Sequence, residues 1–130
     1  MRVKSGTILM YNCSGGKFSK LQQIFAMLRL RMRVVGPDKY HLTLAQLAEG
    51  EGEPAAEFDQ PIPEPMLVFC GLNGALLNQV LEVIRVSKLP KIELKAVLTE
   101  TNQEWTTTQL YEELVEERKA MAEGNKSIHE

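Results

Sequence analysis

Two short runs of the sequence, Thr7–Tyr11 and Met66–Cys70, are apolar at almost every position. Alternation of apolar and polar residues marks a strand with one solvent-facing side, so an unbroken apolar run indicates a strand covered on both faces. Both runs are therefore predicted to be central strands of a sheet that carries helices on its two faces.

The remaining elements follow each run in the same order. A polar turn leads into apolar residues at helical spacing, which predicts a helix after each central strand. Shorter strands are predicted at 33–35 and 91–98. A brief helix is predicted from about 38 to 47, and a long one after Thr106, where Gln109 completes the spacing of a capping box.

The order βαβα-linker-βαβα predicts an α/β fold with a mainly parallel sheet. The two short strands, one of them charged on one side, belong at the edges, and right-handed crossovers then give the strand order 2-1-3-4. We expect a small three-layer, doubly wound sheet of four mainly parallel strands, with helices 1 and 3 on opposite faces. The whole chain, 1–130, is interpreted as a single α/β domain with a frayed tail at 124–130.

Residues 50–65 form an acidic, proline-rich internal loop between the two halves. Counting from Glu49, this segment holds six acids, no base and four prolines. Because it lacks a helical or strand period, it is interpreted as a long crossing loop or a flexible connector rather than a lid. Residues 1–48 carry a net charge of +7, so a basic first part of the sequence is followed by an acidic linker and an acidic C-terminal part.

The composition excludes several classes of protein. The net charge of the 130 residues is −2, which makes a nucleic-acid partner unlikely, and no apolar run is long enough for a membrane span. Two cysteines are too few for a disulfide framework, so a cytoplasmic protein with reduced thiols is expected. With only His41 and His129 as additional soft ligands, neither a metal site nor a cofactor is predicted.

The predicted topology places a ligand crevice between the carboxyl ends of the two central strands, where the strand order reverses. The residues predicted to bind a ligand there are Asn12, Ser14, Gly15, Gly16, Lys17, Cys70, Gly71 and Asn73. A glycine-rich turn at the start of a helix can hold a small anion through its backbone N–H groups. The turn is not a Walker A loop, because Phe18 follows Lys17 where serine or threonine is required.

Cys13 and Cys70 end the two central strands and could approach each other. A thiol pair or a nucleophilic cysteine is one interpretation, and inert packing in the core is the favoured one. A second candidate surface comprises Lys95, Thr99, Thr101 and Asn102, which cluster at the end of the last strand. Edge protection by the lysine and turn formation by the other three would also explain these residues.

The residues around this second surface also carry a family resemblance. Lys95-Ala96-Val97-Leu98-Thr99, then Thr101-Asn102, Trp105, Leu110 and Glu113-Leu114 resemble the core motif of bacterial domain-of-unknown-function family 3783. The resemblance is best over residues 66–121, and it would place proline where this chain has Glu100. It implies a small bacterial, cytoplasmic protein, and it implies no activity, cofactor or catalytic residue.

Three functional hypotheses follow. The favoured one is a non-enzymatic binding or regulatory module, compatible with a homodimer or a small anionic ligand, because no set of acid, base and nucleophile is recognisable. The second is a small thiol-dependent enzyme or redox protein. The third is a protein–protein adaptor that uses the acidic loop and the C-terminal helix. No catalytic residue is assigned.

Overall fold

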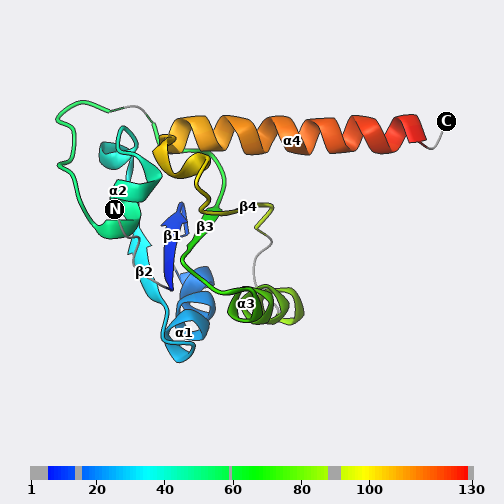
Figure 1. Ribbon diagram of the computed structural model, residues 1–130, viewed down its shortest axis with the longest axis horizontal. Helices are drawn as coiled ribbons and strands as arrows, with labels where there is room; N and C mark the ends of the chain where they lie inside the picture. The colour runs from blue at the N-terminus through cyan, green and yellow to red at the C-terminus, as the bar shows by residue number, and fades with distance from the viewer. Residues whose placement is uncertain (1–5, 14–15, 59, 88–91, 129–130) are drawn as a thin grey trace.

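A four-stranded sheet with helices on both faces forms the protein in a computed structural model that describes residues 6–13, 16–58, 60–87 and 92–128 (Figure 1). The side chains of Lys17 and of residues 123–128 lie outside this description. The elements in chain order are β1 (Thr7–Tyr11), η1 (Gly16–Phe18), α1 (Ser19–Met27), β2 (Arg31–Val34), η2 (Pro37–Lys39), α2 (Leu44–Glu49), β3 (Met66–Cys70), α3 (Gly74–Val86), β4 (Leu94–Val97), η3 (Asn102–Glu104) and α4 (Thr107–Ile128).

The strand order β2-β1-β3-β4 confirms the prediction, with β1 and β3 in the centre. All five residues of each central strand are buried, as their unbroken apolar runs predict. The pairings of β1 with β2 and of β3 with β4 are parallel. The central pair is antiparallel, with Thr7 opposite Cys70 and Tyr11 opposite Met66.

This antiparallel pair places α1 and α3 on the same face of the sheet, so the expectation that they cover opposite faces is wrong. Leu21 and Phe25 of α1 share one apolar cluster with Val80 of α3. The other face is covered by α2 and α4, whose Leu47 and Leu110 share the second cluster. Figure 1 shows the first pair of helices below the sheet and the second pair above it. The three-layer arrangement is therefore confirmed.

The two βαβα halves are related by an approximate two-fold axis that passes between β1 and β3. Each half pairs its first strand with its second in parallel, and each then forms a 3-10 turn and a helix. Thr43 caps α2 through a capping box with Gln46, and Gln109 donates its backbone N–H to Thr106 at the start of α4. Leucine follows the glutamine in both halves. Thr43, rather than Asp38, is the N-cap of the predicted brief helix, because η2 occupies residues 37–39.

The C-terminal helix is longer than predicted. It continues past Gly124 to Ile128, because residues 105–128 contain no proline to stop it. Residues 129–130 of the predicted tail lie outside the described residues. Figure 1 shows the C-terminal part of α4 running clear of the sheet and the other helices. Within the described residues, no helix is both long and apolar enough to span a bilayer.

Candidate functional site

The structure separates the residues of the first predicted site. Because β1 and β3 are antiparallel, Asn12 follows β1 at one end of the sheet, whereas Gly71 and Asn73 follow β3 at the opposite end. The prediction of a crevice shared by these two loops is therefore wrong. The predicted position required parallel central strands, whose carboxyl ends would meet at one edge.

Each half of that predicted site has local structural roles. Asn12, in the left-handed region at φ 55°, donates its side-chain N–H to the carbonyl of Ile62 at 3.4 Å. Gly16 and Lys17 belong to η1, and Ser14 and Gly15 lie outside the described residues. Asn73 caps α3, since its side chain accepts a hydrogen bond from the N–H of Leu76 at 2.8 Å.

The two thiols lie on opposite faces of the sheet and are fully buried. Cys13 belongs to the cluster beneath α1 and α3, and Cys70 to the cluster beneath α2 and α4. Burial raises the pKa of Cys13 to about 11 and that of Cys70 to about 12. Since the thiolate is the reactive form, this environment opposes nucleophilic chemistry at both residues.

The four residues of the second predicted surface line a common hollow. Lys95, Thr99, Thr101 and Asn102 line a volume of about 250 Å³ together with residues at the start of α4. Most of their polar atoms are used inside the fold. Asn102 accepts a hydrogen bond from the Thr99 N–H at 2.8 Å and donates one to the Val97 carbonyl at 3.0 Å, and Lys95 donates to the carbonyl of Ile92. The loop is thus held together by its own polar side chains.

A third hollow, of about 440 Å³, lies between η2, the start of α4, and residues 50–58 and 60–65 of the linker, which we call the strap. Its apolar walls include the aromatic rings of Tyr40, Phe58 and Tyr111. Its remaining lining residues are Pro37, His41, Ala55, Glu57, Gln60, Pro61, Ile62, Pro63, Thr106 and Thr108. We call this hollow the strap cavity.

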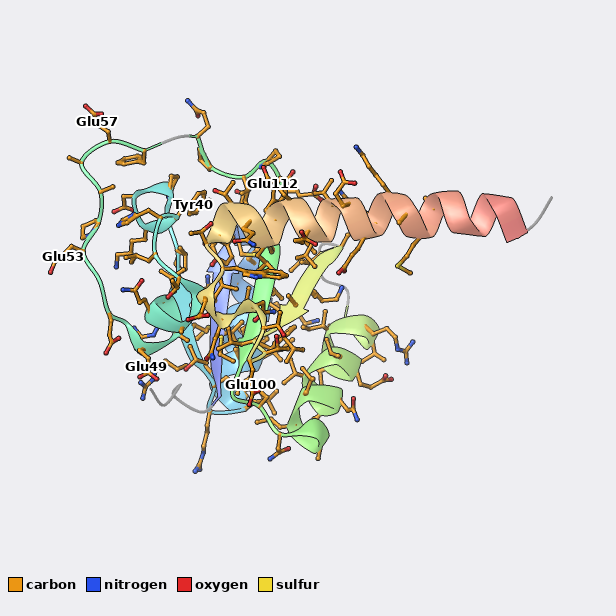
Figure 2. All side chains as sticks on the ribbon, turned by 45° about the horizontal axis from the view of Figure 1, so that its top comes forward. Tyr40, Glu49, Glu53, Glu57, Glu100 and Glu112 are labelled. Atoms are coloured by element: carbon orange, nitrogen blue, oxygen red, sulfur yellow. The ribbon has the colours of Figure 1, made fainter. Side chains whose placement is uncertain are left out.

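The strap is anchored although it contains neither helix nor strand. Ile62 is 7% exposed and belongs to the apolar cluster beneath α2 and α4. Its backbone N–H donates to the hydroxyl of Tyr40 at 3.3 Å. Nearer the other end, the N–H of Ala55 donates to the carbonyl of Asp38 at 2.7 Å. Figure 2 shows Glu53 and Glu57 on the outer side of the strap and Tyr40 inside it.

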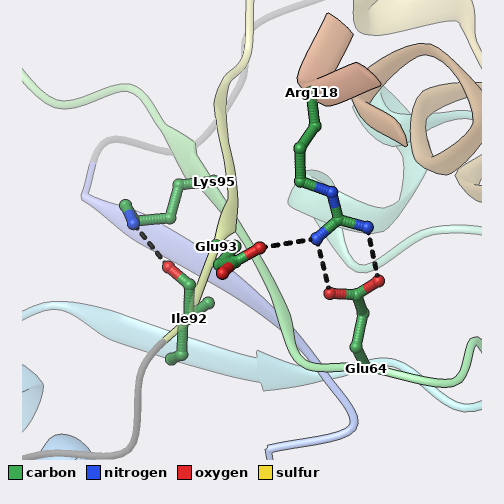
Figure 3. A network of polar contacts seen from close by, with 5 residues as sticks. All are labelled: Glu64, Ile92, Glu93, Lys95 and Arg118. Carbon is green, nitrogen blue, oxygen red and sulfur yellow. Dashed lines mark hydrogen bonds and ion pairs between the residues drawn. The ribbon is translucent and has the colours of Figure 1, made fainter. Parts of the chain in front are cut away.

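An ion-pair network fixes the end of the strap against α4 and β4 (Figure 3). The guanidinium of Arg118 binds both carboxylate oxygens of Glu64 at 2.9 Å, and its Nη1 also donates to Glu93 at 2.8 Å. The hydrogen bonds from Arg118 hold the pKa of Glu64 below its usual value. A bidentate pair of this kind defines direction as well as distance, so it fixes Glu64, the residue that follows Pro63 of the strap cavity lining.

Sequence reasoning missed the strap cavity, since it interpreted residues 50–65 as a connector. The available signal was the spacing of Pro61, Pro63 and Pro65 around Ile62, which gives an extended segment with one large apolar side chain. Its docking partners are distant in sequence. The sequence around Tyr40 and around Arg118 contains no pattern that indicates contact with the strap.

The described lining of the strap cavity contains few titratable groups. Tyr40 packs 6.0 Å from Tyr11, between ring centres, and the hydroxyl of Tyr11 lies 2.9 Å from that of the buried Thr107. Among the described residues of the lining, the titratable ones apart from tyrosine are His41 and Glu57, and both are exposed to solvent. Among the described residues, no group of three or more potential metal-binding side chains is found.

Comparison with known proteins identifies one region of the chain. No match to the chain was found among the curated proteins or among the solved structures. Residues 65–121 match a protein family described as Domain of unknown function (DUF3783). The matched region comprises β3, α3, β4, η3 and most of α4, which is the second of the two related halves. The resemblance of the Lys95–Trp105 motif is therefore confirmed, and the chain carries a DUF3783 domain over residues 65–121.

Proposed function

We propose that this protein is a non-enzymatic binding module that holds a small, mainly apolar ligand in the strap cavity. The observation that carries the proposal is the lining itself, with three aromatic rings and three prolines around about 440 Å³. Ligand sites are typically hollows of about 300–1,000 Å³ with apolar walls and a few polar groups that orient the ligand.

Polar groups at the edge of the strap cavity could orient such a ligand. The Tyr40 hydroxyl accepts the Ile62 N–H, which leaves its own proton to donate. Thr108 and Tyr111 supply further hydroxyl groups from the first turns of α4. A ring-bearing molecule with one or two acceptor atoms would match this combination of aromatic walls and hydroxyl donors.

The state of the two cysteines supports binding over thiol chemistry. Both are free and buried, neither belongs to the lining of the strap cavity, and their raised pKa values oppose ionisation. Free thiols are also typical of a reducing compartment, so we place the protein in the bacterial cytoplasm as part of the proposal.

Binding of small probe molecules tests the proposal. The full chain is titrated with indole and phenol, and separately with glycerol and acetate, while amide resonances are recorded by NMR. We expect the aromatic probes to shift the amides of Tyr40, Ile62 and Tyr111, and the polar probes to leave them unchanged. Tyr111→Ala should abolish the shifts. Met121→Ala, at a position of the same helix that is 69% exposed, should retain them.

The opposite outcomes would contradict the proposal. Shifts that scatter over the surface, or that survive in Tyr111→Ala, would mean that the strap cavity is not the binding site.

A second candidate function is that of an adaptor that presents α4 to a partner, including a second copy of the chain. The observation that favours it is the projection of this helix beyond the body, with Met121 exposed (Figure 1). Sedimentation of the native protein and of Met121→Glu distinguishes the cases. If α4 mediates self-association, the variant sediments as a smaller species, and if it does not, the two proteins sediment alike.

A further inference from the structure

Some backbone groups on the outer edge of β2 have no hydrogen-bond partner among the described residues. This strand lies at the rim of the sheet in Figure 1, and β1 is its one neighbour among the described strands. The N–H groups of Arg31 and Val35 donate inward to Gly6 and Met10 at 2.7 and 2.9 Å. In a parallel ladder the inward groups belong to alternate residues, so the N–H groups of Met32 and Val34 point away from β1. An edge of this kind is a template for another strand.

An open groove runs along the same edge. It has a volume of about 200 Å³, and four consecutive residues, 32–35, form one wall. Lys39, Leu47, Gly50 and Glu51 form the other side, contributed by η2 and the end of α2. Val34 is 64% exposed, so no described side chain covers the end of the strand. The edge is therefore accessible at Arg31 and Val34, the two ends of the strand, and partly exposed between them.

The groove has a positive character on its α2 side. Arg31 and Arg33 alternate with Met32 and project to this side, and neither makes an ion pair within the described residues. Within the described residues, the Nε of Arg33 is buried without a hydrogen-bond acceptor, and the Oε1 of Glu49, at the end of α2, is buried without a donor.

Gly50 allows the Arg33 guanidinium to lie where it does. A Cβ at this position would stand 2.7 Å from the Nη1 of Arg33, and Gly50 adopts φ +74° at the end of α2. The close approach holds the guanidinium at the groove. Glu51 is the one acid among the groove residues, and it partly offsets the charge of Lys39.

The opposite rim of the sheet lacks this combination. At β4 the two-fold related positions carry Lys95 and Ala96 instead of Met32 and Arg33. The Lys95 ammonium already donates to the carbonyl of Ile92, and the neighbouring Glu93 already accepts from Arg118. Within the described residues, the two rims thus differ in charge and in unsatisfied donors, while β2 and β4 pair with their central neighbours in corresponding register.

We propose that the edge of β2 binds an extended acidic segment of a partner protein, which adds to the sheet as a fifth strand. Backbone hydrogen bonds to Met32 and Val34 would supply affinity, as in other cases of strand addition. Carboxylates at alternate positions of the segment would face Arg31 and Arg33 as cross-strand pairs. The residues between them would lie on the other side, beside the exposed Val34. This inference is independent of the strap cavity.

The experiment uses a capped peptide of alternating Glu and Val, with a Lys and Val peptide of equal length as the control. When each peptide is titrated into the full chain at low salt, the chain should bind the acidic peptide. Binding should slow the hydrogen exchange of the Met32 and Val34 amides. The basic peptide should not bind. Raising the salt concentration should weaken binding of the acidic peptide, since part of the affinity comes from the attraction between opposite charges.

Two proline variants distinguish binding at the rim formed by β2 from binding at the rim formed by β4. Val34→Pro removes an outward donor that takes no part in the sheet, and proline is tolerated at such edge positions. We expect it to weaken binding of the acidic peptide by about tenfold or more. Val97→Pro, at the two-fold related position of β4, should bind the peptide as the natural chain does.

Side-chain variants keep the test valid if Val34→Pro does not fold. Arg31→Gln combined with Arg33→Gln leaves the backbone unchanged and should remove most of the binding and its salt dependence. Equal binding of the two peptides, unchanged binding to this double variant, or loss of binding only in Val97→Pro would each overturn the proposal.

Discussion

Thr43 and Thr106 form an isolated antiparallel bridge at the point where α2 and α4 begin. Each threonine accepts a hydrogen bond from a backbone N–H in the first turn of its own helix. The N–H of Leu44 donates to the carbonyl of Trp105 at 2.9 Å, which completes the contact between the two helix starts. The halves of the protein are therefore joined on this face at their capping residues, in addition to the pairing of β1 with β3.

Removing one cap should destabilise the fold by a measurable amount. Thr43→Ala loses the side-chain acceptor of the Gln46 N–H and disrupts the capping box, which typically costs about 1 kcal/mol. Urea denaturation should show a lower midpoint with an unchanged slope. Thr101→Ala is the matched control, because the side chain of Thr101 makes no capping hydrogen bond at η3. Equal stability of the two variants would mean that the capping box is unimportant.

The strap should behave as part of the core rather than as a connector. Ile62→Ala removes a side chain that is 7% exposed, and we expect the free energy of unfolding to fall by about 2–4 kcal/mol. Phe58→Ala changes a larger side chain in the same strap, but one that is 58% exposed, so its effect on stability should be much smaller. Thermal unfolding of both variants checks this, and a negligible effect at Ile62 would contradict the anchored strap.

The Glu64–Arg118 pair should contribute to the pH dependence of stability. The pKa of Glu64 is lowered in the folded protein from its ordinary 4.5, so its contribution is present above that pH and is lost as the pH falls through the folded-state pKa. Stability measured from neutral pH to about pH 3 should therefore fall less steeply in Glu64→Gln than in the natural chain. The difference should shrink in high salt, because both side chains are partly exposed.

Glu112→Gln provides the control for that measurement, since Glu112 is exposed on the same helix (Figure 2). Its pH profile should match that of the natural chain. Identical profiles for all three proteins would show that the ion pair does not stabilise the fold.

The two thiols should react slowly in the native protein. Because burial raises the pKa of Cys13 from 9.0 to about 11, its thiolate fraction at pH 8 falls by about 100-fold, and burial also limits access. Cys70, with a pKa of about 12, should react more slowly still. Alkylation with iodoacetamide, followed by mass spectrometry in buffer and in urea, measures this. Rapid labelling of the native protein would revive the thiol-enzyme hypothesis.

The same burial affects stability at high pH. The folded-state pKa values of both thiols lie above the ordinary 9.0, so the unfolded chain releases these protons first. The contribution of the two protonated thiols to the stability of the fold is fully present below about pH 9, and it is lost as the pH rises towards their folded-state pKa values.

The strand order was predictable from the sequence, because burial of Thr7–Tyr11 and Met66–Cys70 requires central positions. The relative direction of these strands was not predictable from the same pattern. A strand that is apolar at every position presents the same surface whether it runs up or down, and a long loop permits either arrangement. The placement of α1 and α3 and the predicted crevice both depended on that direction.

The candidate site shows a similar limit. Lys95, Thr99 and Asn102 are neighbours in sequence, so their meeting in one hollow could be anticipated. The strap cavity requires Tyr40, Ile62 and Tyr111 to meet, and the ion pair of Glu64 with Arg118 spans a similar distance along the chain. Such contacts depend on the completed fold, and local spacing carries little information about them.

The approximate two-fold axis between β1 and β3 has a consequence for how this protein can change. In a dimer of identical chains every substitution is made twice, and both rims of the shared sheet change together. Here one chain contains both units, so a mutation in β2 leaves β4 as it was. Within the described residues, one rim carries arginines without ion pairs, while the other carries the lysine bound to Ile92 and the loop held by Asn102. Two related units within one chain can therefore differ at their outer rims and keep a common centre.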